Sequence, residues 1–317
     1  MASAAAAVLP VIPTLAAAPE RLDVTIRARE EAGPLPHVWD CVGSDRAAIT
    51  LRKSWRQDID RARAEIGTRR VRFHGILNDE LGVLTRTPQH RTGTPNFKNV
   101  GEVYDGLVSR GLSPLVELSF MPSELASGPA GFGFYKGGIT PPKSLEGWGR
   151  LIGEFATFLI DRYGLNAVAD WPFEVWNEPD LPFFFTGKQA DYFQIYKAAA
   201  IAIKQVSPRL KVGGPATSGA KWLPEFLSFC AAENAPVDFV STHSYAGGMQ
   251  DAKADPTTSI NDVIPNAVRG ARAQVNASRY PKLPLYLDEW SSDSPAMIAH
   301  TIASLIGEVQ LMSHWVL

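Results

Sequence analysis

The chain has 317 residues, of which 45% are hydrophobic and 20% charged, and its formal net charge is −2. This balance is typical of a soluble globular protein and offers no basic or acidic surface for nucleic acid or an anionic membrane. Two cysteines cannot build a disulfide framework, and the six histidines show no metal-ligand spacing, so we expect no metal and no cofactor. No apolar run is long enough to span a membrane.

The first twenty residues are rich in Ala and Pro and contain neither Lys nor Arg. Their apolar stretch and the small residues at 16–18 resemble a secretion signal, but the usual basic leading segment is missing. Residues 1–20 are therefore either a signal or a disordered leader. Periplasmic or secreted and cytoplasmic locations both stay open.

Residues 21–34 alternate apolar and polar side chains, which predicts a strand outside the main sheet. From residue 35 to 317, β-type runs alternate with segments of helical periodicity. The expected strands are 38–42, 71–76, 115–120, 171–177, 212–215, 239–243 and 285–290. The expected helices are 51–66, 100–110, 145–163, 189–206, 222–232, 261–278 and 294–312.

A strand followed by a helix, repeated along the whole chain, predicts an α/β fold of the (β/α)₈ TIM-barrel type. A doubly wound sheet is the alternative, and it would require a glycine-rich phosphate turn that residues 42–45 do not supply. Because the last predicted helix runs to residue 312, an eighth strand could begin only at Trp315. We therefore expect a barrel truncated at or within its eighth strand, with an open edge.

Two of the predicted strands end in a glutamate, at Glu178 in the run 173–180 and at Glu289 in the run 285–290. In a barrel, the carboxyl ends of the strands form one mouth, so both side chains should meet there. Cleavage of a glycosidic bond needs such a pair, one acid that protonates the departing oxygen and one carboxylate. An isolated Asn-Glu pair could merely cap a loop, and the sequence leaves the separation of the two groups open.

Several segments together resemble glycoside hydrolase family 39, which contains bacterial β-xylosidases and the animal α-L-iduronidases. The segments are 41–45, 71–76, 117–122, 173–180, 213–215, 241–245 and 287–292. The Phe120-Met121-Pro122 stretch, the loop 134–136 and residues 181–184 are more similar to the β-xylosidases. The resemblance implies a barrel glycosidase that retains the anomeric configuration and needs no cofactor.

The resemblance also implies roles for individual residues. Glu178 matches the general acid/base and Glu289 the nucleophile, while Asn177 matches a residue that hydrogen-bonds the sugar 2-hydroxyl. The remaining candidates for substrate binding are His74, His243, Tyr245, Phe120, Phe184 and Trp315. Each of these also has a purely structural interpretation, because buried histidines and aromatic residues are common in cores.

The sequence departs from the family at two places. Asp288 stands where Thr is usual before the nucleophile, and Ser291 where Asn is common after it. The extra acid could raise the pKa of Glu289, or it could point to the opposite face of the strand without effect on the site, and strand alternation favours the second alternative. Family members also continue into a C-terminal β-sandwich, which is missing here.

The leading hypothesis is a retaining β-xylosidase with a carbohydrate substrate. The alternatives are another barrel glycosidase, iduronidase-like or endo-acting, and an inactive or carbohydrate-binding fragment. The oligomeric state stays open.

Overall fold

The computed structural model describes residues 25, 27, 29–30, 35–84, 94–247 and 257–317. The chain divides into two units, Met1–Leu35 and Pro36–Leu317. The predicted leader at 1–20 and most of the predicted strand at 21–34 lie outside the described residues. Among the helices that are described, none combines the length and the apolar character needed to cross a membrane.

The second unit alternates strands and helices along the chain. Its strands are β1 (Cys41–Arg46), β2 (Arg70–His74), β3 (Ser113–Leu118), β4 (Gly131–Phe132), β5 (Gly137–Gly138), β6 (Pro172–Val175), β7 (Lys211–Ser218), β8 (Phe239–His243), β9 (Leu285–Trp290) and β10 (Leu311–His314). Its α-helices are α1 (Lys53–Ile66), α2 (Lys98–Val108), α3 (Leu145–Tyr163), α4 (Leu165–Val168), α5 (Gln189–Val206), α6 (Leu223–Ala232), α7 (Val263–Asn276) and α8 (Pro295–Leu305). Short 3₁₀ turns are η1 (Ala47–Leu51), η2 (Asp79–Leu81) and η4 (Ile260–Asp262).

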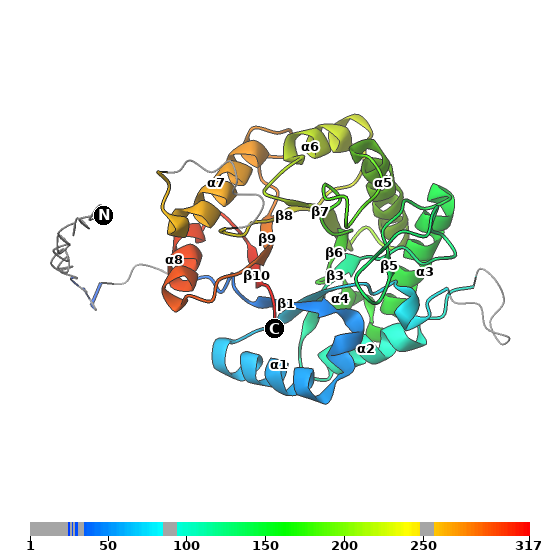
Figure 1. Cartoon of the computed structure of the whole chain (residues 1–317), viewed down its shortest axis with the longest axis horizontal. Coiled ribbons are helices and arrows are strands. Elements are labelled where there is room, and N and C mark those ends of the chain that lie inside the picture. The colour runs from blue at the N-terminus through cyan, green and yellow to red at the C-terminus, as the bar shows by residue number, and fades with distance from the viewer. Residues whose placement is uncertain (1–24, 26, 28, 31–34, 85–93, 248–256) are drawn as a thin grey trace, which may run out of the picture. The chain divides into compact units, whose positions relative to one another are not determined.

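Eight of the strands form a closed barrel in the order β1-β10-β9-β8-β7-β6-β3-β2. All neighbouring pairs are parallel. Figure 1 shows the helices arranged as a ring around these strands. The predicted (β/α)₈ barrel is therefore confirmed.

The interior of the barrel changes character along its axis. Near the start of the strands, a small apolar layer contains Cys41, Leu115 and Leu311, with Tyr286 packed against it. Nearer the carboxyl ends, the buried residues of the strands are charged, beginning with Arg72 and Glu174. Apolar side chains therefore fill the barrel near the start of the strands, and the buried charged side chains lie nearer the carboxyl ends.

The end of the chain differs from the prediction. Helix α8 begins with a cap, in which the Ser294 hydroxyl accepts from the Met297 N–H, and it ends at Leu305. Gly307 then takes φ of +90°, which an L side chain rarely adopts, and the chain turns back into the barrel. The apolar residues after this turn, which prolong the helical pattern in the sequence, form β10.

Strand β10 pairs with β9 on one side and with β1 on the other, so the barrel has no open edge. The expectation of a barrel truncated within its eighth strand is wrong, because that strand begins at Leu311 rather than at Trp315. Within the described part of the chain, no β-sandwich follows the barrel.

Candidate active site

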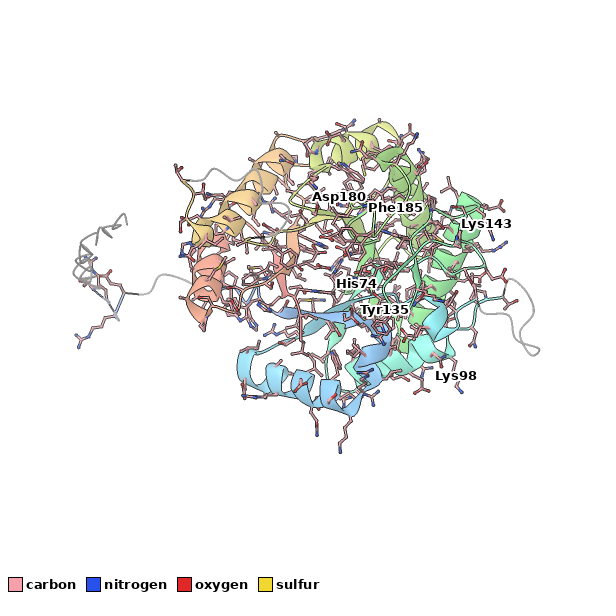
Figure 2. All side chains as sticks on the ribbon, viewed as in Figure 1. His74, Lys98, Tyr135, Lys143, Asp180 and Phe185 are labelled. Carbon is pink, nitrogen blue, oxygen red and sulfur yellow. The ribbon has the colours of Figure 1, made fainter. Side chains whose placement is uncertain are left out.

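Polar side chains from several strands meet at the carboxyl end of the barrel. In Figure 2, His74 and Asp180 lie inside the ring of helices, whereas Lys98 and Lys143 lie at its periphery. The buried polar residues that the strands and the turns after them bring to this end are Arg72, His74, Glu117, Glu174, Asn177, Glu178, His243, Asp288 and Glu289. The two glutamates singled out in the sequence thus share one site with the predicted histidines.

Glu178 lies in the turn after β6, and contacts with β7 hold this turn. Its φ is 41°, a value at which a non-glycine residue is strained unless its surroundings hold it. The Glu178 N–H donates to the carbonyl of Ala216 at 2.9 Å. Asp180 accepts from the N–H of Ser218 at 2.9 Å and from Lys221 Nζ at 3.0 Å. The turn is therefore fixed to β7 at the glutamate itself and again two residues after it.

Asp288 and Glu289 are consecutive on β9, yet both belong to the interior site. Strand β8 pairs Thr242 with Leu287 and His243 with Glu289, so Asp288 is left over in a bulge. A bulge interrupts the alternation of side chains between the two faces of a strand. The prediction that Asp288 points away from the site is therefore wrong, and its Oδ2 lies 3.5 Å from Nε of Arg72.

Arg72, which is fully buried, is the central cation of the site. Its Nε donates to Glu174 Oε1 at 2.8 Å and its Nη1 to Glu289 Oε1 at 2.6 Å. Its Nη2 donates to Asn177 Oδ1 at 2.9 Å and lies 2.9 Å from Glu117 Oε2. Burial alone would lower the pKa of Arg72, but the charges of Glu174, Glu117 and Glu289 outweigh burial and raise it.

The contact with Arg72 also orients the amide of Asn177. Because a guanidinium can only donate, the Asn177 atom facing it must be the oxygen. The amide nitrogen, which is buried, has no hydrogen-bond partner in the described residues. Among the described residues, Asn177 therefore has a buried N–H donor without a partner, on a residue whose oxygen shares Arg72 with Glu289.

Glu289 is surrounded by groups that stabilise its charged form. The Tyr245 hydroxyl donates to its Oε2 at 2.8 Å, and Nδ1 of His243 lies 3.5 Å from the same oxygen. Burial alone would raise the pKa of Glu289, but His243, Arg72, His74 and the Tyr245 hydrogen bond together lower it to about 2. The surroundings of Glu289 thus favour its carboxylate form.

Each of the two histidines makes a short contact with one glutamate of the site. Nδ1 of His243 lies 2.9 Å from Glu178 Oε1, and Nδ1 of His74 lies 2.7 Å from Glu117 Oε2. Burial lowers the pKa of His243, but the charges of Glu289 and Glu178 outweigh it and raise the pKa. Burial also lowers the pKa of His74, and Glu117 together with Glu289 reverses this effect.

The two candidate catalytic carboxyl groups are close together. One oxygen of Glu178, one of Glu289 and a ring nitrogen of His243 all lie within 4.8 Å of one another. A second such group contains His74, Glu117 and Glu289. Three ligands of this type could in principle bind a metal ion. Here, however, the carboxylates already have cationic or hydrogen-bond partners in Arg72, Tyr245 and the histidines.

Aromatic side chains line one side of the site. The ring of Trp315, which is partly exposed, lies 4.7 Å from the ring of His74, and Phe184 lies 5.8 Å from it. Phe120, which is completely buried, stacks on Phe184 at 6.4 Å and also packs against His74. Trp315 thus offers an accessible ring, whereas Phe120 supports the residues next to it.

Three members of the site were not among the residues singled out from the sequence: Arg72, Glu117 and Glu174. Each stands inside a strand whose neighbours are apolar, as in the run Val71-Arg72-Phe73. Strands of a parallel barrel are buried on both faces, so a charged residue in the middle of one must have a partner. This signal was available in the sequence and identifies all three.

Known proteins resemble most of this chain. It is 42% identical over 288 residues to a β-xylosidase of Caldicellulosiruptor saccharolyticus, covering 89% of this chain and 58% of that protein. A β-xylosidase of Geobacillus stearothermophilus is 33% identical over 302 residues, with 87% of this chain and 59% of that protein covered.

A solved structure of a monomeric β-xylosidase from Caulobacter crescentus CB15 superimposes with a TM-score of 0.83 at 36% identity. The superposition covers 91% of this chain and 62% of that one. The chain thus spans less than two thirds of the length of these relatives.

The sequence profile described as glycosyl hydrolases family 39 matches residues 22–306. This match and the relatives above confirm the resemblance found in the sequence. The chain belongs to glycosyl hydrolase family 39.

Proposed function

We propose that this chain carries the catalytic barrel of a retaining β-xylosidase, which removes β-D-xylosyl residues from xylo-oligosaccharides or β-xylosides. Family membership and the β-xylosidase relatives support the substrate class. In this proposal, Glu289 is the nucleophile and Glu178 the general acid and base. The two carboxyl groups account for every bond change in the reaction.

In the first step, a carboxylate oxygen of Glu289 attacks the anomeric carbon, and the bond from that carbon to the leaving oxygen breaks. Glu178 gives its proton to this oxygen, so the departing group leaves as an alcohol. The contacts of Glu289 with Arg72 and Tyr245 hold it ionised and aimed. The N–H of Asn177 can donate to a sugar hydroxyl, which leaves the proton of that hydroxyl free to point at the carboxylate of Glu289; contacts of the 2-hydroxyl strengthen in the transition state.

In the second step, Glu178, now a carboxylate, takes a proton from water. The resulting hydroxide oxygen bonds to the anomeric carbon, and the ester bond to Glu289 breaks. Two inversions at the same carbon give net retention. Glu289 is ionised before the first step and Glu178 before the second. His243 contacts both glutamates and can stabilise the negative charge on either one.

The observation that carries this proposal is the spacing of the two glutamates, whose nearest oxygens lie within 4.8 Å. Retaining enzymes hold their carboxyl groups about 5–5.5 Å apart, whereas inverting enzymes need roughly 6.5–9.5 Å to admit a water molecule. The short separation favours attack by the carboxylate itself.

The test compares the parent with Glu289→Ala and Glu178→Ala on a panel of aryl glycosides, with and without azide. We expect hydrolysis of the β-D-xyloside by the parent and none by Glu289→Ala. Azide should rescue Glu289→Ala with the α-glycosyl azide as product, and Glu178→Ala with the β-glycosyl azide. Preference for another sugar would replace the substrate class but not the mechanism. The opposite stereochemistry of the azide products would refute the assignment of the two glutamates.

A further inference from the structure

Asp288 is a buried carboxyl group that has no hydrogen bond. Its side chain is completely inaccessible, and neither carboxyl oxygen has a hydrogen-bond partner among the described residues. Nε of Arg72 is 3.5 Å away and Nε2 of His243 is 3.7 Å away, both beyond a good hydrogen bond. The donors of Arg72 serve Glu174, Glu289 and Asn177 instead.

The charge around Arg72 is unbalanced if every acid is ionised. Glu117, Glu174, Asp288 and Glu289 all form close ion pairs with this one arginine. A buried carboxylate without a hydrogen bond is costly, and such a group usually takes up a proton instead. Asp288 is the member of this set with the weakest contact to the cation, so it is the group on which the proton should reside.

Glu174 offers an acceptor for that proton. Its Oε2 is buried and has no partner in the described part of the chain, while Oε1 accepts from Arg72. The carboxyl groups of Asp288 and Glu174 face the same atom, Nε of Arg72, at 3.5 Å and 2.8 Å, so they lie beside each other. Two carboxylates can share a hydrogen bond only if one of them carries a proton. One proton between the pair satisfies both unpaired groups at once.

We propose that Asp288 is a neutral carboxylic acid in the working enzyme, donates a hydrogen bond to Glu174 and thereby acts as a positioning residue for Glu289. When Oε2 of Glu174 accepts a hydrogen bond from Asp288, Glu174 does not compete with Glu289 for a second N–H group of Arg72. The Nη1 of Arg72 then remains on the nucleophile, at 2.6 Å from Oε1 of Glu289. The bulge in β9 is what brings this acid into the interior beside the nucleophile.

The surroundings of Asp288 agree with this assignment. Burial and the negative charge of Glu174 raise the pKa of Asp288 well above its usual range. Burial alone would raise the pKa of Glu174, but the charge of Arg72 outweighs burial and lowers it. Arg72 on β2 and His243 on β8 lie 3.5 Å and 3.7 Å from Asp288, and Glu174 on β6, Tyr192 on α5, and Tyr286 and Glu289 on β9 interact with it electrostatically.

His243 is the one neighbour whose protonation would favour an ionised Asp288. Its Nδ1, however, faces Glu178 at 2.9 Å and Glu289 at 3.5 Å, so the carboxylate of the nucleophile already balances its charge. The separation of 3.7 Å between its Nε2 and Asp288 leaves no direct hydrogen bond. Glu174 therefore remains the partner of Asp288.

The proposal has a consequence for stability that does not depend on activity. An aspartate in the unfolded chain loses its proton at about pH 3.9, whereas Asp288 keeps it in the native state. Between these two pKa values, the native state holds more protons than the unfolded state, so the free energy of unfolding falls as the pH rises. Asparagine at this position has the shape of the neutral acid and cannot titrate.

The first experiment measures thermal unfolding of the parent and of Asp288→Asn between about pH 4 and about pH 8. We expect the midpoint of the parent to fall by several degrees relative to that of Asp288→Asn as the pH rises. In the same samples, the infrared band of protonated carboxylic acids at neutral pH should be weaker in the variant than in the parent, by the contribution of one carboxyl group. A difference in midpoint that is constant with pH, or that grows in favour of the parent, overturns the proposal.

The second experiment compares Asp288→Thr with Asp288→Val, two side chains of the same shape of which only threonine has a donor for Glu174. For Asp288→Val we expect the acid limb of kcat/KM against pH to shift upward by about one unit, with a loss of about tenfold near that limb. Asp288→Thr and Asp288→Asn should restore the parental limb. Equal profiles for Thr and Val, or an Asn variant as impaired as Val, would contradict the role of the donor.

The kinetic experiment rests on the proposed function, whereas the unfolding experiment does not. If no glycoside of the panel is hydrolysed, the proposed function fails and the pH dependence of unfolding still decides the state of Asp288. If activity is present and the unfolding trend is absent, the function stands and this inference is wrong.

Discussion

Replacement of Arg72 by methionine tests whether one cation holds the interior of this barrel together. Methionine retains much of the length of the side chain but removes the charge and every donor. Glu117, Glu174 and Glu289, all buried, would then lose the partner that lies within 2.6 to 2.9 Å of each. Removing one partner of a buried ion pair typically costs about 3–5 kcal/mol.

We expect a loss at the upper end of that range, because hydrogen bonds to charged groups contribute about 1.5–3 kcal/mol each. Uptake of protons by the orphaned acids limits the loss to about 5 kcal/mol. For a domain of this size, an unfolding entropy of about 2.1 cal/mol/K per residue makes each 1 kcal/mol worth about 1.7 °C in the midpoint of thermal unfolding, so Arg72→Met should melt roughly 8 °C lower at neutral pH.

The pH dependence of this deficit distinguishes lost charge pairing from lost packing. The folded pKa of Glu289 is lowered to about 2, so its contribution to stability is present above its unfolded pKa and is lost as the pH falls toward that value. The difference between parent and Arg72→Met should therefore be greatest above about pH 5 and shrink toward about pH 2.

The matched control is Arg61→Met, which removes an exposed arginine paired with Glu65 at 2.8 Å and should leave the midpoint unchanged. Circular dichroism melts of the three proteins in the same buffers suffice. A deficit that is equal at all pH values, or no larger than that of the control, would refute a charge-centred interior.

Two further predictions concern the glutamates. Tyr245→Phe removes the hydroxyl that donates to Glu289 at 2.8 Å, so the pKa of Glu289 should rise and the acid limb of kcat/KM should move upward by about one unit. The check is a pH–rate profile, with recovery of activity at neutral pH as proof that the protein stays folded, and an unmoved limb would contradict the role of the hydroxyl. Asp180→Asn weakens the contact with Ser218 that fixes the turn of Glu178, and should slow xylosides with poor leaving groups about tenfold. Dinitrophenyl xyloside, which needs little proton donation, should be spared, and an equal loss on both substrates would indicate a general structural defect instead.

The parts of the fold that depend on local pattern were predicted well from the sequence. Helices α3 and α5 and strands β8 and β9 have the predicted bounds. In α3, the apolar residues recur with helical spacing, the Ser144 hydroxyl caps the start, and Gly164 follows the end. Where periodicity, cap and stop signal agree, the sequence contains enough information to place the element.

The eighth strand shows where local pattern is insufficient. Val309, Leu311 and Met312 continue the apolar spacing of α8, so the helix was predicted to continue through them. Only the glycine at 307 marks the break, and a single glycine is compatible with a helix interior at modest cost. Residues 311–314 form a strand because they pair with β1 on one side and β9 on the other. This pairing depends on the closed barrel and not on the local sequence.

The site was predicted in its two glutamates but not in its electrostatic centre. Strand ends with acids pointed to Glu178 and Glu289, because the barrel architecture places all such ends at one mouth. The position of Asp288 depends on a bulge, and that bulge depends on the register between β8 and β9. The register between neighbouring strands cannot be read from the apolar–polar alternation of one strand. The alternation alone therefore predicts that Asp288 points away from the site, which is wrong.

The closure of the barrel by β1 and β10 bears on the order in which the protein folds. The seam pairs Cys41 with Ser313, and the ion pair between Arg72 and Glu289 joins residues 217 positions apart in the sequence. Contacts of such separation are entropically expensive and form late in folding. We therefore expect the catalytic site to be the last part of the molecule to become ordered during folding.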